Sequence, residues 1–355
     1  MSKNPTKKYF VSIIWVYFKY FHDFSAEENY HLHALLIAKE LGYQPVAIVR
    51  GSAENMKKDP HFDKVIEVIE YTGVIRYLWD VIRYAWRGTT FYVNSYEWQS
   101  FVVPFISRKA IFMAHTQPQR RNRLKQKIQN FVYKFFFKVR LNNQTEKDFL
   151  LTQNIDEKKL IVVPLVVSQQ YFYKNDNQNR KDLVYFGNVT EKKNLSTILK
   201  ALAIVKKTKP DIKLNVIGQI MDPNFNATIS TLELTNNVVL YGFVELKDLA
   251  NKLNDNLIYL NSSFDEGQCV AVYDSALCGC ALCLPKIMSF TGVFKDKALF
   301  HDVTDENKLA ENILSYLQDP KLMKTHNEAC IEMIKNEYSK ETVEEKLKKL
   351  FEPAR

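Results

Sequence analysis

Short apolar runs alternate with helical stretches through the C-terminal half of this chain, and this alternation constrains its fold more than any other feature. The apolar runs are residues 183–186, 214–217, 238–241, 257–260 and 281–284. Helical spacing of apolar residues marks 195–207, 246–253, 270–277 and 306–317. Strands that alternate with helices form a parallel sheet with helices on both faces. We therefore expect a doubly wound α/β domain.

The N-terminal half shows the same rhythm less regularly. We expect strands at 10–16, 45–49, 90–93, 110–114 and 160–163, and helices at 25–41, 74–86 and 145–151. A chain of 355 residues is also too long for one ordinary core, which favours a second doubly wound domain.

A polar run at 175–181 has no apolar periodicity and predicts a linker. The expected organisation is an N-terminal domain at 1–167, a linker at 168–181 and a C-terminal domain at 182–335. The tail at 321–350 has helical spacing, and we expect its end, 336–355, to pack back across the domain junction. Two domains that face each other create a cleft, a favoured place for ligands.

Composition and charge narrow the function classes. An apolar content of 46% and a charged content of 25% are typical of a folded globular protein. The net charge of +9 indicates an anionic partner, and it leaves open a nucleotide, a phospholipid surface and nucleic acid. The longest N-terminal apolar run is interrupted at Lys19, and no uninterrupted run approaches the roughly 18 to 20 residues of a transmembrane helix.

The cysteines indicate the compartment. Their number, five, is odd, and four of them cluster at 269–283, which argues against a disulfide framework and for a reducing compartment, the cytoplasm. A zinc site at Cys278, Cys280 and Cys283 is an alternative, but no fourth ligand lies nearby in the sequence. We therefore expect small buried side chains and no metal.

The segment around Glu266 carries the strongest chemical signal. Glu266 follows the apolar run 257–260, Gly267 frees the backbone to turn, and a helix is expected at 270–277, with Asp274 about two turns inside it. A strand-loop-helix unit of a parallel sheet presents its loop at the carboxyl edge, where the helix N-terminus favours an anion. The segment therefore predicts a site for a phosphorylated ligand with hydroxyl groups.

A second segment, 187–194, links the strand at 183–186 to its helix. Gly187 opens a turn, and Lys193 stands at the helix start, where an ammonium group and backbone amides together bind phosphate. A solvated lysine is the ordinary alternative for such a position. The combination with the Glu266 loop on the same sheet strengthens the phosphate interpretation.

These motifs resemble glycosyltransferase family 4, the retaining nucleotide-sugar enzymes with the GT-B fold. Residues 187–193 are similar to that family's G-R-L-x-x-x-K turn, and 266–279 to its E-G-x6-E-A-x-x-x-G pattern. Residues 142–146, 163–164 and 238–242 also fall where the family has counterparts. The resemblance implies two Rossmann-like doubly wound domains and transfer of a sugar from a nucleotide diphosphate sugar.

The resemblance also implies a role for each matching residue. Lys193 would neutralise the donor's diphosphate, Glu266 would bind the sugar hydroxyls and Asp274 the ribose, and His115 would face the sugar from the other domain. A core histidine at a strand end is the alternative for His115. The remaining implied donor-binding positions are Gly187, Asn188, Gly267, Gln268, Cys269, Val270 and Ala271.

The expected chemistry agrees with these roles. Cleavage of an anomeric carbon–phosphate bond develops negative charge on the diphosphate, which fixed cations and dipoles stabilise. The family uses no metal, so we expect no cofactor. The resemblance also implies a nucleotide diphosphate sugar as the donor, and we expect it to be UDP- or GDP-linked. The expected function is metal-independent, retaining transfer to a glycan or lipid-linked acceptor, in cell-surface polysaccharide or glycolipid synthesis.

Three departures from the family pattern favour a different class, a non-catalytic GT-B protein that binds a nucleotide or a partner. Asn188 stands where the family has arginine, and Asp274 where it has glutamate. The glycine-rich loop after the family's first strand has no counterpart at 21–28.

Two basic segments rich in aromatic residues suggest a third function, a peripheral membrane module. One runs from Arg120 to Lys138, and the other, at 74–87, mixes Arg76, Arg83 and Arg87 with tyrosines and tryptophans. Both could lie on an anionic bilayer at the inner face of the cell membrane. The alternative is a sheet-covering helix with its aromatics in the core. No nucleic-acid motif accompanies them, so we expect no nucleic acid.

Overall fold

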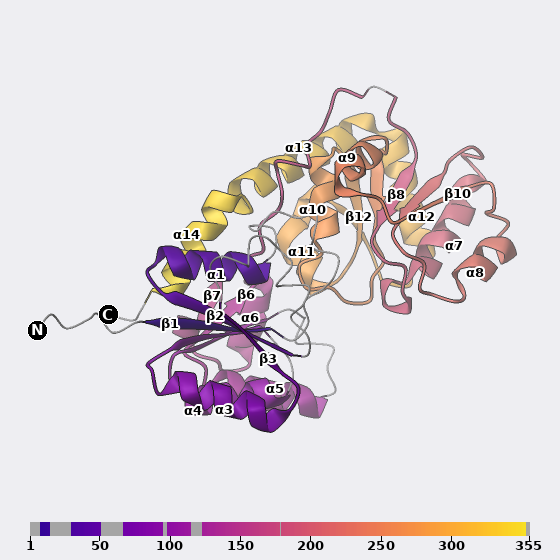
Figure 1. Ribbon diagram of the computed structural model, residues 1–355. Coiled ribbons are helices and arrows are strands. Elements are labelled where there is room, and N and C mark those ends of the chain that lie inside the picture. Colours follow the sequence, from indigo (N-terminus) through magenta and orange to yellow (C-terminus); the bar gives the residue numbers. More distant parts are fainter. Residues whose placement is uncertain are drawn as a thin grey trace, which may run out of the picture. The chain divides into compact units, whose positions relative to one another are not determined.

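The computed structural model describes residues 8–14, 30–50, 67–94, 98–114, 123–177 and 179–352, and it forms two compact units (Figure 1). The first unit comprises Met1–Val166 together with Lys340–Arg355, and the second is Val167–Ser339. Each unit is built on its own parallel sheet.

The first sheet has seven strands in the order β3-β2-β1-β4-β5-β6-β7, all paired in parallel. The strands are β1 (Tyr9–Ile14), β2 (Gln44–Arg50), β3 (Glu67–Tyr71), β4 (Thr90–Asn94), β5 (Ala110–Met113), β6 (Lys138–Leu141) and β7 (Leu160–Val162). The helices of this unit are α1 (Tyr30–Glu40), α3 (Val74–Ala85), α4 (Val103–Ile106), α5 (Arg123–Tyr133), α6 (Gln144–Thr152) and α14 (Lys340–Phe351), with the 3-10 turns η2 (Trp98–Val102) and η4 (Glu157–Lys159).

Both faces of this sheet are covered, as the strand β1 illustrates. Its Val11 and Ile13 belong to a core cluster shared with α3 and α5, whereas Phe10 and Ile14 belong to a cluster shared with α1 and α14. Side chains alternate along a strand, so apolar residues at neighbouring positions, such as Phe10 and Val11, bury both faces of β1.

The last helix, α14, belongs to the first unit through its apolar side, which includes Leu347 and Phe351. His33 Nε2 lies 3.2 Å from Glu344 Oε1, and the Tyr43 hydroxyl donates to the Phe351 carbonyl at 3.1 Å. The C-terminal end of the chain thus completes the core that the first strands begin.

The second sheet has six parallel strands in the order β10-β9-β8-β11-β12-β13. They are β8 (Leu183–Phe186), β9 (Leu214–Ile217), β10 (Val238–Gly242), β11 (Ile258–Leu260), β12 (Ala281–Pro285) and β13 (Leu299–His301). The helices are α7 (Leu195–Lys206), α8 (Phe225–Thr231), α9 (Leu246–Asn254), α10 (Val270–Leu277), α11 (Met288–Phe294), α12 (Glu306–Gln318) and α13 (Pro320–Glu337), with the 3-10 turns η5 (Glu191–Lys193) and η6 (Lys295–Lys297).

Local sequence sets several helix boundaries. Asn143 caps α6 by accepting from the Glu146 amide at 2.9 Å, while the Glu146 carboxylate accepts from the Asn142 amide at 2.8 Å. Asp319 caps α13 by accepting from the Leu322 amide, and Pro320 occupies the first helical position. The tail expected to be helical at 321–350 is interrupted between α13 and α14.

The expected fold class is confirmed, because both units are doubly wound parallel sheets. The described parts of all ten predicted strands are present. The sequence interpretation missed β3, β6, β13, α4, α8 and α11. Among the described residues, no helix has both the length and the apolar character to cross a membrane.

A buried histidine in the second unit makes its stability depend on pH. His301 ends β13 and is 0% exposed; burial lowers its pKa to about 4, against the smaller opposite effects of Asp305 and Asp302. Between pH 4 and 6.5 the unfolded chain therefore binds a proton that the folded chain does not. The stabilisation is complete above about pH 6.5 and is lost as pH falls towards 4, on the order of 3 kcal/mol in all.

We expect chemical denaturation at a series of pH values to show this loss in the wild-type chain. A non-titrating His301→Gln variant serves as the comparison, and its unfolding free energy should vary less between pH 6.5 and 4. Equal slopes in the two proteins would contradict the assignment to His301.

Candidate functional site

The two chemical segments found in the sequence follow neighbouring strands of the second sheet. β8 pairs with β11, with Leu183 opposite Ile258 and Val184 opposite Tyr259. The strand order reverses here, because β9 lies on the other side of β8 and β12 on the other side of β11. In open α/β sheets, ligands bind outside the carboxyl ends of the strands at such a switch point. The loops 187–194 and 261–269 leave the sheet at this position.

Two glycines allow the turns after β8 and β9 to approach closely. Gly187 and Gly218 have φ angles of +144° and +139°, a region that side chains disfavour. A Cβ on Gly218 would lie 2.1 Å from the Gly187 carbonyl oxygen. Glycine at 218 is therefore required by the turn that presents the 187–194 loop.

Asn194 joins the two loops, and the sequence interpretation gave it no role. Its backbone is left-handed (φ +51°), and its side-chain amide donates to the Ser262 carbonyl at 3.2 Å and the Val303 carbonyl at 2.9 Å. In return, the Ser262 hydroxyl donates to the Asn194 carbonyl at 2.6 Å. Asparagine tolerates the left-handed region, so an asparagine directly before an apolar helix start was the available signal.

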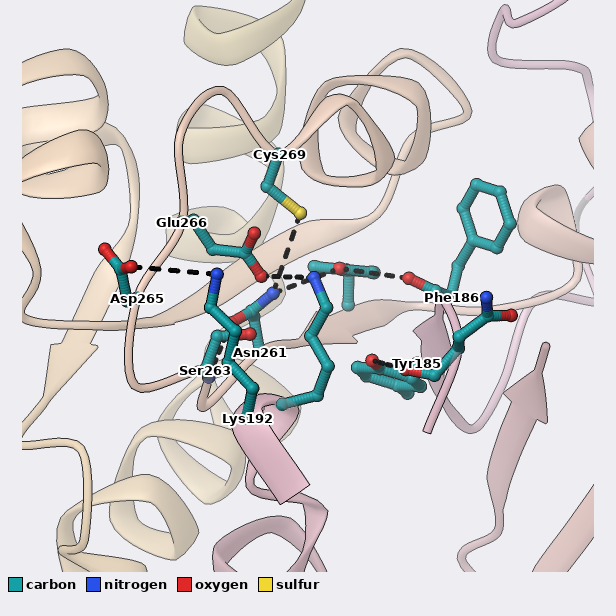
Figure 2. Close-up of polar contacts among 11 residues, drawn as sticks. Tyr185, Phe186, Lys192, Asn261, Ser263, Asp265, Glu266 and Cys269 are labelled. Atoms are coloured by element: carbon teal, nitrogen blue, oxygen red, sulfur yellow. Dashed lines mark hydrogen bonds and ion pairs between the residues drawn. The ribbon is translucent and has the colours of Figure 1, made fainter. Parts of the chain in front are cut away.

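Lys193 and Glu266 meet between the loops. Lys193 Nζ lies 2.5 Å from Glu266 Oε1, with side chains 23% and 9% exposed. Beside them, Lys192 Nζ lies 3.6 Å from Asp265 Oδ2 (Figure 2). The Phe264 amide also donates to the Lys192 carbonyl at 3.0 Å, which fixes the two loops at backbone level.

The Lys193 ammonium group stays charged in this setting. Burial acts to lower its pKa, but the charge and hydrogen bond of Glu266 and the charge of Asp265 outweigh burial and raise the pKa above its ordinary value. A cation thus stands at the edge of the sheet in partial contact with solvent. It is held by a carboxylate that an incoming anion could replace.

Further polar groups lie around this pair (Figure 2). The Asn261 side-chain amide donates to the Tyr259 hydroxyl at 3.4 Å, and Asn261 Oδ1 accepts from the Ser263 amide at 2.9 Å. Cys269 Sγ lies 3.9 Å from the same Asn261 amide. Burial, followed by the charge of Glu266, raises the pKa of the Cys269 thiol to about 12, so this thiol is protonated at neutral pH and is not a nucleophile.

The helix α10 starts directly after these groups. Cys269 is its N-cap, so the amides of the first turn, at Val270 and Ala271, lack partners within the helix and carry the positive end of its dipole. Gly267 and Gln268 form the preceding turn. Asp274 is buried and lies just over one turn into α10, closer to the loop than the two turns expected.

Asn188 is exposed on the turn after β8. Its Oδ1 accepts from the Gln219 amide at 3.3 Å, and its carbonyl accepts from the Tyr185 hydroxyl at 3.1 Å. Asn188 therefore stabilises the turn, and the cations nearest the site are Lys192 and Lys193.

The structure brings together the predicted site residues of the second unit. His115 lies outside the described residues, as do 21–28 and 120–122. The candidate site is therefore defined by the second unit, at positions 187–194, 261–271 and 274.

The cysteine cluster forms no metal centre in the described part of the chain, where no group of three or more His, Cys, Asp or Glu side chains is placed to hold an ion. Cys278 and Cys280 pack in one core cluster, and Cys283 packs in another. Burial raises the pKa of Cys280 to about 12. These are the small buried side chains that the sequence predicted.

Comparison with known proteins agrees with this geometry. Residues 168–337 match the family model described as Glycosyl transferases group 1. No curated protein matches the chain by sequence.

Solved structures match nearly the whole chain. The Anabaena HepE protein in complex with UDP is 14% identical, with a TM-score of 0.78, over 96% of this chain and 99% of its own. A glycosyltransferase from Rickettsia africae is 17% identical, with a TM-score of 0.75, over 98% of this chain and 100% of its own. Sucrose-phosphate synthase from Thermosynechococcus elongatus is 14% identical, with a TM-score of 0.75, over 97% of this chain and 98% of its own. The chain therefore has the GT-B fold, and its residues 168–337 match the group 1 glycosyltransferases.

Proposed function

We propose that this protein is a retaining glycosyltransferase that moves a sugar from a nucleotide diphosphate sugar to a glycan or lipid-linked acceptor. The ion pair of Lys193 and Glu266 at the switch point carries the proposal. When the donor binds, its diphosphate takes the place of Glu266 beside the Lys193 ammonium. Glu266 is then available to accept hydrogen bonds from the sugar hydroxyls.

The site provides the positive charge that the leaving diphosphate needs. Lys193 is charged and fixed, and the N-terminus of α10 directs its first amides to the same edge of the sheet. Fixed donors cost no reorganisation during the reaction. We therefore propose that transfer requires no metal.

The finer assignments rest on similarity. The spacing of Glu266 and Asp274 resembles the retaining family 4 enzymes, which supports retention of the anomeric configuration and a ribose role for Asp274. The Anabaena HepE protein has been solved with UDP and with UDP-glucose, which supports a uridine-linked donor as the first choice and a guanosine-linked donor as the second. We further propose a role in cell-surface polysaccharide or glycolipid synthesis.

The compartment follows from the thiols. All five cysteines are free, and four are buried. We propose that the protein works in the reducing cytoplasm.

A donor panel tests the function. We expect one nucleotide and its sugar, among uridine, guanosine, adenosine and thymidine diphosphates, to raise the unfolding temperature by several degrees at a hundredfold excess over Kd. That sugar should then be transferred in the presence of a chelator, and the anomeric configuration of the product read by NMR. An inverted product would contradict retention, and loss of transfer with the chelator would contradict metal independence.

A non-catalytic GT-B protein is the second candidate. It is favoured by Asn188, which contributes to a turn where the family carries a cation. Nucleotide binding without transfer of any sugar would support this candidate over the first.

A further inference from the structure

The helix α3 has an apolar stripe on its outer side. At about 100° per residue, Ile75, Trp79, Ile82 and Trp86 lie within about 60° of one another around the helix axis. These side chains are exposed by 87%, 64%, 39% and 89%. The same helix buries Tyr77, Val81 and Tyr84 on its opposite side. The outer stripe is therefore additional to the face that holds α3 on the sheet.

Neighbouring segments extend the stripe into a patch. α3 packs against α4, where Phe105 is exposed, and the Phe105 ring lies 4.7 Å from that of Phe135. The Phe135 ring in turn lies 5.1 Å from that of Phe131 on α5. In Figure 1, α3, α4 and α5 lie together on the side of the first sheet opposite α1 and α14. The exposed large apolar residues on α3, α4, α5 and the segments that adjoin them are Ile75, Trp79, Ile82, Trp86, Trp98, Phe105, Leu124, Ile128, Phe131 and Phe135.

The tryptophans are the most unusual part of this patch. The chain has four, and the three that the structure describes, Trp79, Trp86 and Trp98, are all more than 60% exposed. Trp79 and Trp86 form part of the α3 stripe, and Trp98 lies on η2, which packs against α4. Large apolar side chains gathered on a surface mark an interaction site. Tryptophan is also enriched at the membrane–water interface, where its ring is amphipathic.

The charges around the patch identify its partner. Between residues 72 and 134 the sequence has two acidic residues, Asp80 and Glu97, and eleven basic ones. Asp80 is buried and paired with Arg76 at 2.9 Å. The exposed basic residues of the same segments include Arg76, Arg83, Arg87, Arg108, Lys127 and Lys134. A second copy of the chain would bring an equally basic face, so self-association is opposed by charge. An anionic surface is complementary.

We propose that this patch docks on an anionic lipid bilayer, with the α3 stripe in the interface and the arginines among the headgroups. The sequence suggested two alternatives for these segments, core packing and membrane contact. The structure divides the residues between them, because Tyr77, Tyr84, Tyr133 and Phe136 are buried while the tryptophans face outward. The inference stands on the first unit and does not depend on the proposed sugar transfer.

Vesicle sedimentation with the full chain tests this docking. We expect the wild-type protein to sediment with phosphatidylcholine vesicles that contain phosphatidylglycerol and to bind pure phosphatidylcholine at least tenfold less. The double variant Trp79→Ser/Trp86→Ser should lose about tenfold or more in partitioning to anionic vesicles. Arg83→Glu should lose about tenfold as well.

Matched controls separate the patch from general effects. Tyr173 is 61% exposed on the second unit, and Lys200 is exposed on α7, so Tyr173→Ser and Lys200→Glu make comparable changes elsewhere. Both controls should bind vesicles like the wild type. Binding that survives in the tryptophan double variant, or that falls equally in Lys200→Glu and Arg83→Glu, would overturn the proposal.

A second measurement needs no variant. Tryptophan fluorescence of the wild-type chain should be quenched by anionic vesicles that contain brominated acyl chains, because Trp79 and Trp86 would reach the interface. Absence of both sedimentation and quenching would overturn the proposal. Self-association through the patch, or binding of nucleic acid that requires Trp79 and Trp86 while vesicles are ignored, would assign the patch to another partner.

Discussion

Replacement of Lys193 with alanine should weaken nucleoside-diphosphate binding by about 10- to 100-fold. The ammonium group is the more buried of the two cations at the switch point, and a charge-assisted hydrogen bond of this kind contributes about 1.5–3 kcal/mol. Isothermal titration with the nucleotide selected by the donor panel measures the loss.

Two neighbouring lysines provide graded controls for this variant. Lys192 is half exposed and lies 3.6 Å from its carboxylate, so Lys192→Ala should cost no more than about fivefold. Lys200 lies on the outer side of α7 and should have no effect. Equal losses in Lys192→Ala and Lys193→Ala would show that the whole basic turn, and not Lys193, holds the diphosphate.

Lys193→Ala has a second expected consequence, for stability. It leaves the Glu266 carboxylate, 9% exposed, without its cation, which should lower the free energy of unfolding by about 1–3 kcal/mol. Adding Glu266→Gln removes the uncompensated charge, so the double variant should regain stability while nucleotide binding stays weak. Denaturant unfolding of the two variants distinguishes this electrostatic loss from general damage to the fold.

The sequence predicted the parts of this molecule where local pattern and burial agree. Strands such as β8 and β11 are short apolar runs between turn residues, and their side chains are buried on both faces. Because both are followed by chemically distinctive loops, the topology of a parallel sheet was enough to place Lys193 and Glu266 at one edge.

In the elements that the sequence analysis missed, the local sequence pattern does not indicate the burial that the structure shows. β3, at the edge of its sheet, has only the apolar pair Val68 and Ile69 between Glu67 and Glu70, which is too short for an apolar run. β6 contains Arg140, a residue that sequence patterns place on a surface.

Arg140 is nevertheless 2% exposed, because its guanidinium donates to three buried oxygens. These are the Val163 carbonyl at 2.7 Å, the Pro164 carbonyl at 2.6 Å and the Tyr92 hydroxyl at 2.7 Å. A buried charge can be satisfied in this way, but its partners are distant in sequence, so no local pattern reveals them.

Partners that are distant in sequence also explain why the sequence analysis missed some residues of the candidate site. Asn194 bridges loops that are 68 and 109 residues away, so its role depends on tertiary structure. The exposure of Trp79 and Trp86 also depends on tertiary structure. Both sides of α3 carry large apolar side chains, so helical spacing alone does not tell which side packs on the core. The sequence thus proposes residues for the chemistry, and the structure was needed to show which side chains hold them in place.

Glu266→Gln should lower sugar transfer at least a hundredfold while nucleoside-diphosphate affinity changes by no more than a few fold. The substitution keeps the shape of the side chain and an oxygen near Lys193 Nζ. It removes the negative charge that, in the proposed function, faces the sugar, where positive charge develops in the transition state. The nucleotide without its sugar makes no use of that charge. In the Glu266→Gln variant the nucleotide also no longer competes with a carboxylate for Lys193. The affinity of the variant for the nucleotide should therefore be preserved or slightly increased.

Steady-state transfer and titration with the nucleotide, measured on the same preparation, test this separation. Glu332→Gln, an exposed change on α13 outside the candidate site, is the matched control and should leave both quantities unaltered. Loss of nucleotide affinity and transfer in parallel would mean that Glu266 only shapes the diphosphate site. Unchanged transfer would remove Glu266 from the mechanism. The predicted divergence of the two quantities would instead place the carboxylate at the sugar, because only the step that handles the sugar would respond to its charge.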